Sequence, residues 1–467
     1  MRHLKKPRMR AWRDELPALG LIAFLILVFA TGGSARSDIA SLVVLRPLAG
    51  LACAAAILGL SSRHVVENRF LFSMAAALLG VVALHLLPLP PGAAASLPGR
   101  EIVREIDLAA GTADVWRPLS MVPATTLNAL FALLVPLAVL LIGVQLPMTD
   151  RGRLLPVLIA FAALSAFVGL LQSIGSLGNF YPSTSDGMAV GLFANRNHQA
   201  ITLALTFPML ATYASMPAKS AEVEKLRTWL SAAVGLALIP LILVTGSRTG
   251  LLIGLVGIGI AVALFRRQPT VAAAKKRRAA KIGWPYALAA FVFFSLVALT
   301  VIMARAEALQ RLIAGDPLED KRFKILGPIL EMAWKYFPFG SGAGSYVEIF
   351  QIDEPYDLLT FTYSNHAHND WVETLLTMGL PGVALLTVAT IGFFFSAHRT
   401  FGSASRARGN LALARLGYAI VGMLGLASMV DYPLRTPTLG SVFVIAALWT
   451  AGRPESQKKL APEMTSS

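Results

Sequence analysis

Long apolar runs without charged residues recur from one end of the sequence to the other, and Leu127 to Leu146 and Tyr286 to Met303 are two of them. A run of roughly 18 residues or more is the length that an α-helix needs to cross the hydrocarbon core of a bilayer. One soluble core could not bury so many of these runs, because the chain is 55% hydrophobic and only 14% charged. We therefore expect an all-α fold, that of a polytopic integral membrane protein.

The apolar runs predict about twelve transmembrane helices. The first run follows a basic segment and precedes Gly33-Ser34-Ala35, so it could be read as a cleaved signal peptide, but the eleven runs behind it favour a retained helix. The expected spans lie near 16–32, 39–60, 70–90, 124–146, 154–174, 198–216, 228–245, 250–265, 284–304, 371–397, 411–430 and 437–452.

The distribution of charge predicts the orientation of these spans. With both chain ends in the cytoplasm, 27 of the 41 Lys and Arg residues fall inside, whereas 18 of the 26 acidic residues fall outside. This agrees with the positive-inside rule, and segments 91–123, 175–197 and 305–370 then face outward. The basic loop from Arg266 to Lys281 is expected to anchor the topology and to contact anionic membrane lipids.

Composition excludes two other classes of function. The net charge of +15 does not come from a continuous basic patch or an RNA-binding motif, so no nucleic acid partner is expected. The single cysteine, Cys53, lies in an apolar run, which leaves neither a disulfide framework nor a cysteine metal site.

The chain divides into four predicted parts. They are a basic cytoplasmic N-terminus (1–15), N-terminal transmembrane helices (16–174), a central core (175–397) and C-terminal helices with a cytoplasmic tail (398–467). The core includes the long outer segment 305–370 before the tenth span. Loops of that length are usually functional or disordered, and the high aromatic content of this one argues against disorder.

Two polar clusters stand at outer membrane edges, where a charge is costly unless it has a use. The first contains Asn195, Arg196 and Asn197 beside His198, and it is either a capped helix start or a binding site. The second is Arg248 in a turn flanked by Gly246 and Gly250. Arg248 either extends to lipid headgroups or holds a phosphate, because the glycines would permit close approach and a guanidinium fork matches a pair of phosphate oxygens.

The third cluster follows the long outer segment. It contains His366 and His368 beside Asn365, Asn369 and Asp370. Histidine titrates near neutral pH and can accept a proton from a sugar hydroxyl. A purely structural role and a metal site are the alternatives, but no third spaced histidine or HExxH pattern supports a metal, so we expect none.

The stretch that begins at His368, HNDWVETLLTMGLPG, resembles the signature of the O-antigen ligase and polymerase superfamily. In that signature a His is followed by Asn, Ser or Gln, then nine residues, Gly, two residues, and Gly, Thr or Tyr. His368, Asn369, Gly379 and Gly382 occupy these places without a gap.

Two arginines extend the resemblance. Arg248, four residues before Leu252, is similar to the family's Arg and Leu element. Arg322 stands where relatives place a second essential Arg, ahead of a Trp and a Pro-x-Gly-x-Gly turn, here Trp334, Pro338, Gly340 and Gly342. Arg311, Lys321 and Lys324 are rivals for the role of Arg322.

The resemblance implies transfer of a glycan from undecaprenyl diphosphate at the outer face of the cell inner membrane, with inversion and without a metal or other cofactor. His368 would be the general base, Arg248 and Arg322 would hold the diphosphate, and Arg196 would assist. Asn195, Asn197, His366 and Asn369 are the other candidate substrate-binding residues.

The acceptor remains open between lipid A core, for a ligase, and a second lipid-linked glycan, for a polymerase, with a slight preference for the ligase. A relative that glycosylates proteins is a further alternative. A transporter or flippase of the same lipid-linked glycan is the rival from another class, although it should carry charged residues deep in several helices, and these spans have few.

Overall fold

A computed structural model describes residues 12–181, 188–265, 317–359, 363–402 and 408–451. These residues are mostly helical, as the sequence predicts, and the strands among them are two residues long. Four helical stretches are long and apolar enough to cross a membrane: Pro123–Gly143, Met148–Ser173, Ala221–Val244 and Asp370–Phe401. The sequence prediction of a helical membrane protein therefore holds in its main point, and the exact number of spans stays a prediction.

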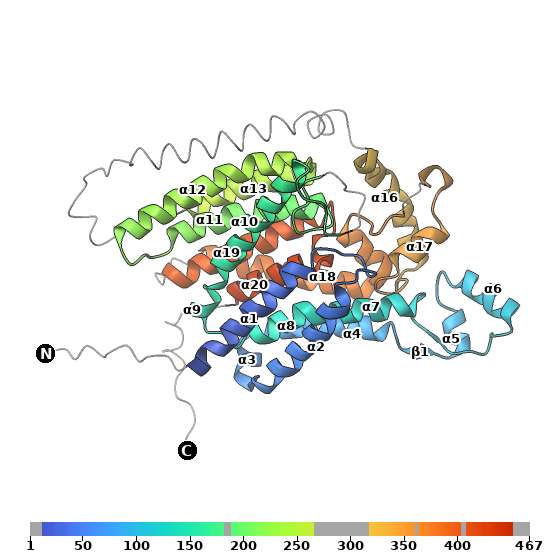
Figure 1. The fold of residues 1–467 in the computed structure, drawn as a ribbon. Coiled ribbons are helices and arrows are strands. Elements are labelled where there is room, and N and C mark those ends of the chain that lie inside the picture. The colour runs from blue at the N-terminus through green and yellow to red at the C-terminus, as the bar shows by residue number, and fades with distance from the viewer. Residues whose placement is uncertain (1–11, 182–187, 266–316, 360–362, 403–407, 452–467) are drawn as a thin grey trace, which may run out of the picture.

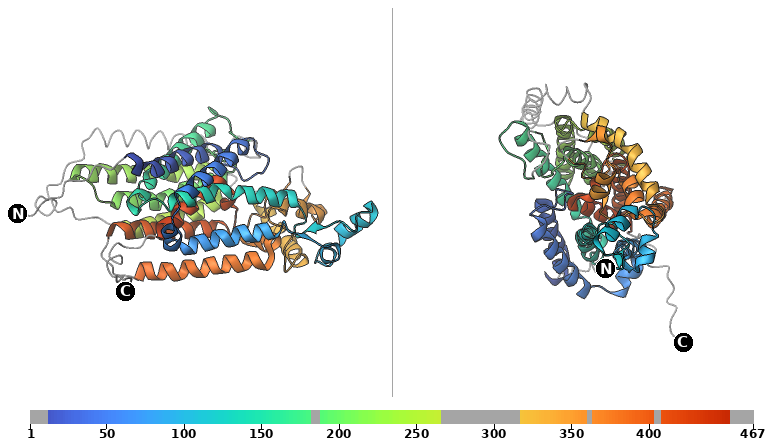
Figure 2. Two further views of the ribbon diagram at one scale, coloured as in Figure 1. Left: turned by 90° about the horizontal axis from the view of Figure 1, so that it is seen from below. Right: turned by 90° about the vertical axis from the view of Figure 1, so that its right-hand side faces the viewer.

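Helices occupy the predicted spans that fall in the described part of the chain, while the expected span 284–304 lies outside it. The helices that coincide with predicted spans run roughly parallel in one bundle (Figures 1 and 2). They are α1 (Trp12–Thr31), α2 (Leu42–Leu58), α4 (Arg69–Leu84), α7 (Pro123–Ala132) with α8 (Leu134–Gly143), α10 (Leu154–Ser173), α11 (Arg196–Ser215), α12 (Ala221–Val244), α13 (Arg248–Leu264), α18 (Asp370–Gly402), α19 (Arg408–Ala427) and α20 (Pro437–Thr450). The short helices α3 (Ser62–Glu67) and α9 (Met148–Arg151) connect them.

Helix α11 is enclosed by other helices and differs from a lipid-facing span. It packs against α10, α12, α13 and α19, and nearly all of its residues are buried. It is also too polar to appear among the apolar helices. Polar side chains are tolerated here because they bond within the helix; the Thr202 and Thr206 hydroxyls, for example, donate to carbonyl groups four residues earlier. The run predicted at 198–216 is thus a helix enclosed by other helices.

The long outer segments are folded in their described parts. In 91–123, α5 (Pro91–Ala95) and α6 (Glu101–Ala110) are closed at the base by antiparallel strands β1 (Pro88–Leu89) and β2 (Arg117–Pro118). In 305–370, α16 (Pro317–Lys335), α17 (Tyr346–Ile352) and η1 (Tyr356–Leu358) form a small core with buried Tyr336, Tyr346 and Phe350. Figures 1 and 2 show α5, α6, α16 and α17 gathered at one end of the bundle, as the topology predicts for outer segments on the same side.

The first glycine of the superfamily signature, Gly379, lies at a break in α18. Gly379 has φ 56° and ψ −147°, inside what is otherwise one helix. The turn after α16 packs into this break, where the amide of Leu380 donates to Pro338 O at 2.7 Å and the amide of Gly342 donates to Thr377 O at 2.9 Å. A Cβ atom on Gly379 would lie 2.2 Å from Pro338 O, so only glycine fits. The signature glycine therefore joins the Pro-x-Gly-x-Gly turn to the helix that begins after the histidines.

Candidate active site

The first two polar clusters meet at the N-terminal ends of α11 and α13. Asn195 caps α11 by accepting a hydrogen bond from the Asn197 amide at 2.8 Å, and Ser247 caps α13 by accepting one from the Gly250 amide at 2.9 Å. The Ser247 hydroxyl also donates to Asn197 Oδ1 at 2.7 Å, and both residues are buried. Two helix N-termini are thereby fixed side by side, with their partial positive charges on the same side.

Tyr432 connects these helix ends to the histidine cluster. Asn195 Nδ2 donates to the Tyr432 hydroxyl at 3.2 Å. The Tyr432 ring lies 5.0 Å from the ring of His198, 4.4 Å from that of His366 and 5.0 Å from that of His368, measured between centroids. Tyr432 belongs to the turn between α19 and α20, which contains η2 (Pro433–Arg435). Three clusters that are far apart in the sequence therefore form one site.

His368 faces a buried carboxylate. Its Nδ1 lies 3.4 Å from Asp431 Oδ1, and the Asp431 side chain is fully buried. The same oxygen accepts the amide of Tyr432 at 3.0 Å, which fixes the carboxylate in place. An imidazole whose Nδ1–H points at a carboxylate has its basic lone pair on Nε2. The pair has the composition of a general base and the group that orients it.

The backbone at His368 is strained. Its φ is +51°, and no other non-glycine residue in the described chain has a positive φ. Such a conformation persists only when the surroundings enforce it, and it occurs most often at functional sites. The positive φ therefore distinguishes the backbone of His368 from that of His366.

A buried ionic network supports the loop that carries the histidines. The carboxylate of Glu373 lies 3.0 Å from His366 Nδ1 and accepts the Ala367 amide at 3.0 Å. Arg435 donates through Nε to Asp370 at 2.8 Å and lies 3.4 Å from Glu373. Burial lowers the pKa of Arg435, but the charges of Glu373 and Asp370 raise it, and the net shift is upward. Arg435 therefore stays charged and ties the start of α18 to the turn before α20.

The structure describes some of the predicted arginines fully and others only in part. Arg196 is buried in the first turn of α11, and Arg248 is half-buried in the first turn of α13. A cation in the first turn opposes the helix dipole, so its presence in both adjacent helices needs a reason beyond helix stability. The backbone of Arg322 lies in α16, and its side chain is outside the described part of the structure, as is all of Arg311.

The structure shows local contacts for the glycines beside Arg248 and for Asn369. Gly250 faces Ala200 of α11, where a Cβ on Gly250 would lie 2.2 Å from the Ala200 Cβ, so its role is helix packing and not close approach of a ligand. Gly246 adopts φ +63° in the turn. Asn369 Oδ1 accepts the amides of Trp371 and Val372 at 3.1 Å, so this oxygen caps α18.

The sequence prediction missed four residues of the site: Glu373, Asp431, Tyr432 and Arg435. Asp431 and Arg435 had a detectable signal, because two opposite charges stand in a short turn between apolar runs at an outer edge. Glu373 lies inside the signature stretch, one turn into a helix whose later residues are apolar. The described residues contain no group of three or more His, Cys, Asp or Glu side chains arranged to hold a metal ion.

The fold and site together define a polytopic helical membrane protein with an array of histidine, carboxylate and arginine side chains at one end of its bundle. Residues 232–387 match the sequence model of the O-antigen ligase family, which confirms the resemblance and supports membership of the O-antigen ligase superfamily. The match includes Arg248, His366 and His368, whereas Asn195 and Asp431 lie outside it. No curated protein matches the chain. This match points to glycan transfer of the ligase or polymerase type, with lipid-linked glycan and acceptor substrates.

Proposed function

We propose that the protein transfers a glycan from undecaprenyl diphosphate to an acceptor hydroxyl at the periplasmic face of the inner membrane. The observation that carries this proposal is the 3.4 Å contact between His368 Nδ1 and the buried carboxylate of Asp431, at the helix ends that also carry Arg196 and Arg248. The proposed ligase-like core is 175–397, and the family match at 232–387 lies within it.

His368 accepts the proton in this mechanism. Nε2 takes the proton of the acceptor hydroxyl as its oxygen forms a bond to the anomeric carbon, and the bond from that carbon to the diphosphate oxygen breaks on the opposite face. The stereochemistry is therefore inverted. Asp431 stabilises the imidazolium that forms and holds Nδ1 as the hydrogen-bond donor. The neighbouring ring of Tyr432 restricts the orientation of the imidazole.

Undecaprenyl diphosphate is the leaving group, and negative charge increases on it as the bond breaks. Arg248 and Arg196, together with the N-termini of α11 and α13, concentrate positive potential where such a charge would be stabilised. Arg322 is proposed as a further contact. The donor is already activated, so the mechanism uses no nucleotide and no metal cofactor.

The remaining candidates have supporting roles. Asn195 and Asn197 position the helix ends and the Tyr432 hydroxyl, while His366 and Asn369 shape the loop around His368. With both chain ends in the cytoplasm, the array faces the periplasm. A reporter fused after Arg278 should then report the cytoplasm.

A transfer assay with defined substrates tests the proposal. Full-length protein in nanodiscs would receive a labelled glycan on undecaprenyl diphosphate together with lipid A core, or with a second lipid-linked glycan. Label on lipid A core identifies a ligase, which we favour slightly, and longer chains on the carrier identify a polymerase. Product should still form with EDTA present. A donor that crosses the bilayer unchanged, with no new glycosidic bond, would instead identify a flippase.

A further inference from the structure

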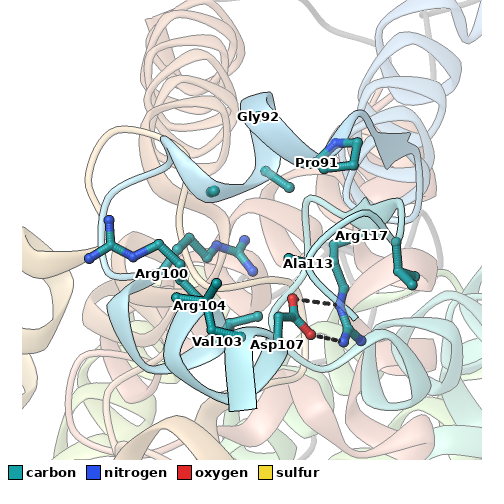
Figure 3. Close-up of a pocket in the computed structure, with 12 residues that line it drawn as sticks. Pro91, Gly92, Arg100, Val103, Arg104, Asp107, Ala113 and Arg117 are labelled. Atoms are coloured by element: carbon teal, nitrogen blue, oxygen red, sulfur yellow. Dashed lines mark hydrogen bonds and ion pairs between the residues drawn. The ribbon is translucent and has the colours of Figure 1, made fainter. Parts of the chain in front are cut away.

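A cavity of about 200 Å³ lies in the outer hairpin formed by α5, α6 and β2, apart from the histidine site (Figure 3). Small side chains of Pro91, Ala94 and Ala95 form part of its wall, and Arg100, Arg104 and Arg117 line it with a single acid, Asp107. The volume accommodates one monosaccharide unit. The charge of the lining is positive.

Arg100 is a buried cation without a partner of opposite charge in the described chain. It is 6% exposed and donates one hydrogen bond, to the carbonyl oxygen of Leu119. Its Nε has no hydrogen-bond partner among the described residues. Arg100 forms no ion pair with any of their carboxylates. Burial lowers the pKa of Arg100 to about 10, so the group is still protonated at neutral pH. An unpaired buried charge is costly, which favours a bound anion.

The single acid of the cavity does not compensate Arg100. Asp107 forms an ion pair with Arg117 and accepts the Thr112 hydroxyl at 2.9 Å. Figure 3 shows the contacts of Asp107 with Arg117 as dashed lines. The Arg104 side chain has no hydrogen bond or ion pair with a described residue. Two cations therefore remain for a ligand.

The hairpin is held against the turn that fits the break in α18. A Cβ atom on Gly99, one residue before Arg100, would lie 2.5 Å from the Tyr336 ring, and the Met121 amide donates to Ser341 O at 2.8 Å. The cavity is thus at the same end of the bundle as the histidine site. A saccharide bound at the histidine site could extend along this end of the bundle toward the cavity. Saccharides are therefore the class of ligand we consider for it.

We propose that this cavity binds one anionic sugar unit, whose carboxylate or phosphate oxygens pair with Arg100 and Arg104. The anion is inferred from the unpaired Arg100, whereas the saccharide class rests on the proposed function. Small wall residues admit the sugar ring, and the guanidinium groups supply paired donors to the oxyanion.

Binding to the full-length protein in phosphatidylcholine nanodiscs tests the site. Calorimetry should show that glucuronate and glucose 6-phosphate bind about tenfold or more tightly than glucose. Arg100→Met should weaken glucuronate binding by a similar factor, and Arg104→Gln by about threefold or more. Arg63→Gln, which removes an exposed arginine paired with Glu67, is the matched control and should change nothing. If Arg100→Met does not fold, the exposed Arg104→Gln variant still tests whether the cavity binds the anion.

Three outcomes would overturn the proposal. Equal affinity for glucuronate and glucose would show that the site does not require an anion. Inorganic phosphate that binds as tightly as glucose 6-phosphate would show that the site does not recognise the sugar. Loss of glucuronate binding in nanodiscs that contain phosphatidylglycerol would identify a lipid headgroup as the occupant. His368→Ala should leave glucuronate binding intact. Failure of glycan transfer in a protein that still binds glucuronate would count against the proposed function and not against this site.

Discussion

The carboxylate of Asp431 lies 3.4 Å from Nδ1 of His368, although 63 positions separate the two residues. Asp431 is fully buried, and the amide of Tyr432 fixes the same oxygen that faces the imidazole. The turn between α19 and α20 thus brings a carboxylate to the signature histidine from outside the region of the family match. A carboxylate in this position selects one tautomer of the imidazole.

Asp431→Asn should lower the rate of glycan transfer by about 10²-fold or more, because a neutral amide does not stabilise the imidazolium that forms when His368 takes the proton. The KM values for donor and acceptor should change much less than kcat. Steady-state transfer by the purified variant measures both quantities. Asp353→Asn, which removes the carboxylate partner of Lys335, is the control. Equal rates for Asp431→Asn and wild type would show that the pairing has no part in the chemistry.

Arg248→Lys and Arg248→Ala should both lose most glycan transfer at normal membrane levels of protein. A long basic side chain that only reaches lipid headgroups can be lysine, whereas a clamp on two phosphate oxygens needs the planar guanidinium fork. Transfer from the intact lipid-linked donor and binding of that donor should fall together. Wild-type transfer by Arg248→Lys would leave the headgroup explanation, and the diphosphate role would pass to Arg322 or Arg196.

The sequence predicted the bundle better than the site. Membrane-length apolar runs are a local property, so the positions of spans such as α12 and α18 could be read directly. The signature likewise singled out His368 as the candidate base, which stays a prediction. The partners of His368 could not be inferred, because the contact with Asp431 depends on how α18, α19 and α20 pack. A spacing rule describes residues within one segment and contains no information about a segment 63 positions away.

Gly250 illustrates a second limit of sequence interpretation. Its position beside Arg248 suggested room for a ligand, yet the space is filled by Ala200 of α11. The sequence shows that a small residue is present, but it does not show which neighbour requires it. Interhelical contact is a frequent reason for small residues in membrane helices.

Gly250→Ala should lower the free energy of unfolding by about 1–3 kcal/mol, because the new Cβ would lie 2.2 Å from the Ala200 Cβ and would push α13 away from α11. Thermal unfolding in detergent micelles measures the change. Gly259→Ala in the same helix is the matched control, since a Cβ there meets nothing within 4 Å. Stability equal to wild type in Gly250→Ala would contradict the packing role.

Glu373→Ala should lower the free energy of unfolding by about 3 kcal/mol, because His366 Nδ1 and the Ala367 amide lose their acceptor and Arg435 loses one of two carboxylates. Glu373→Gln keeps a neutral acceptor and should lose less. The same unfolding assay applies, with the exposed Glu331→Ala of α16 as control. A stability loss no greater than that of Glu331→Ala would show that the network does not hold the loop.

Single-turnover transfer by His368→Ala and His366→Ala, at saturating donor and acceptor, tests the central claim most directly. Because general base catalysis typically contributes about 10²- to 10⁴-fold, His368→Ala should lose a factor in this range while its insertion and donor binding stay normal. His366→Ala should lose much less, and the exposed His398→Ala should match wild type. Full activity in His368→Ala, or activity lost in His366→Ala but retained in His368→Ala, would contradict the assignment of His368 as the base.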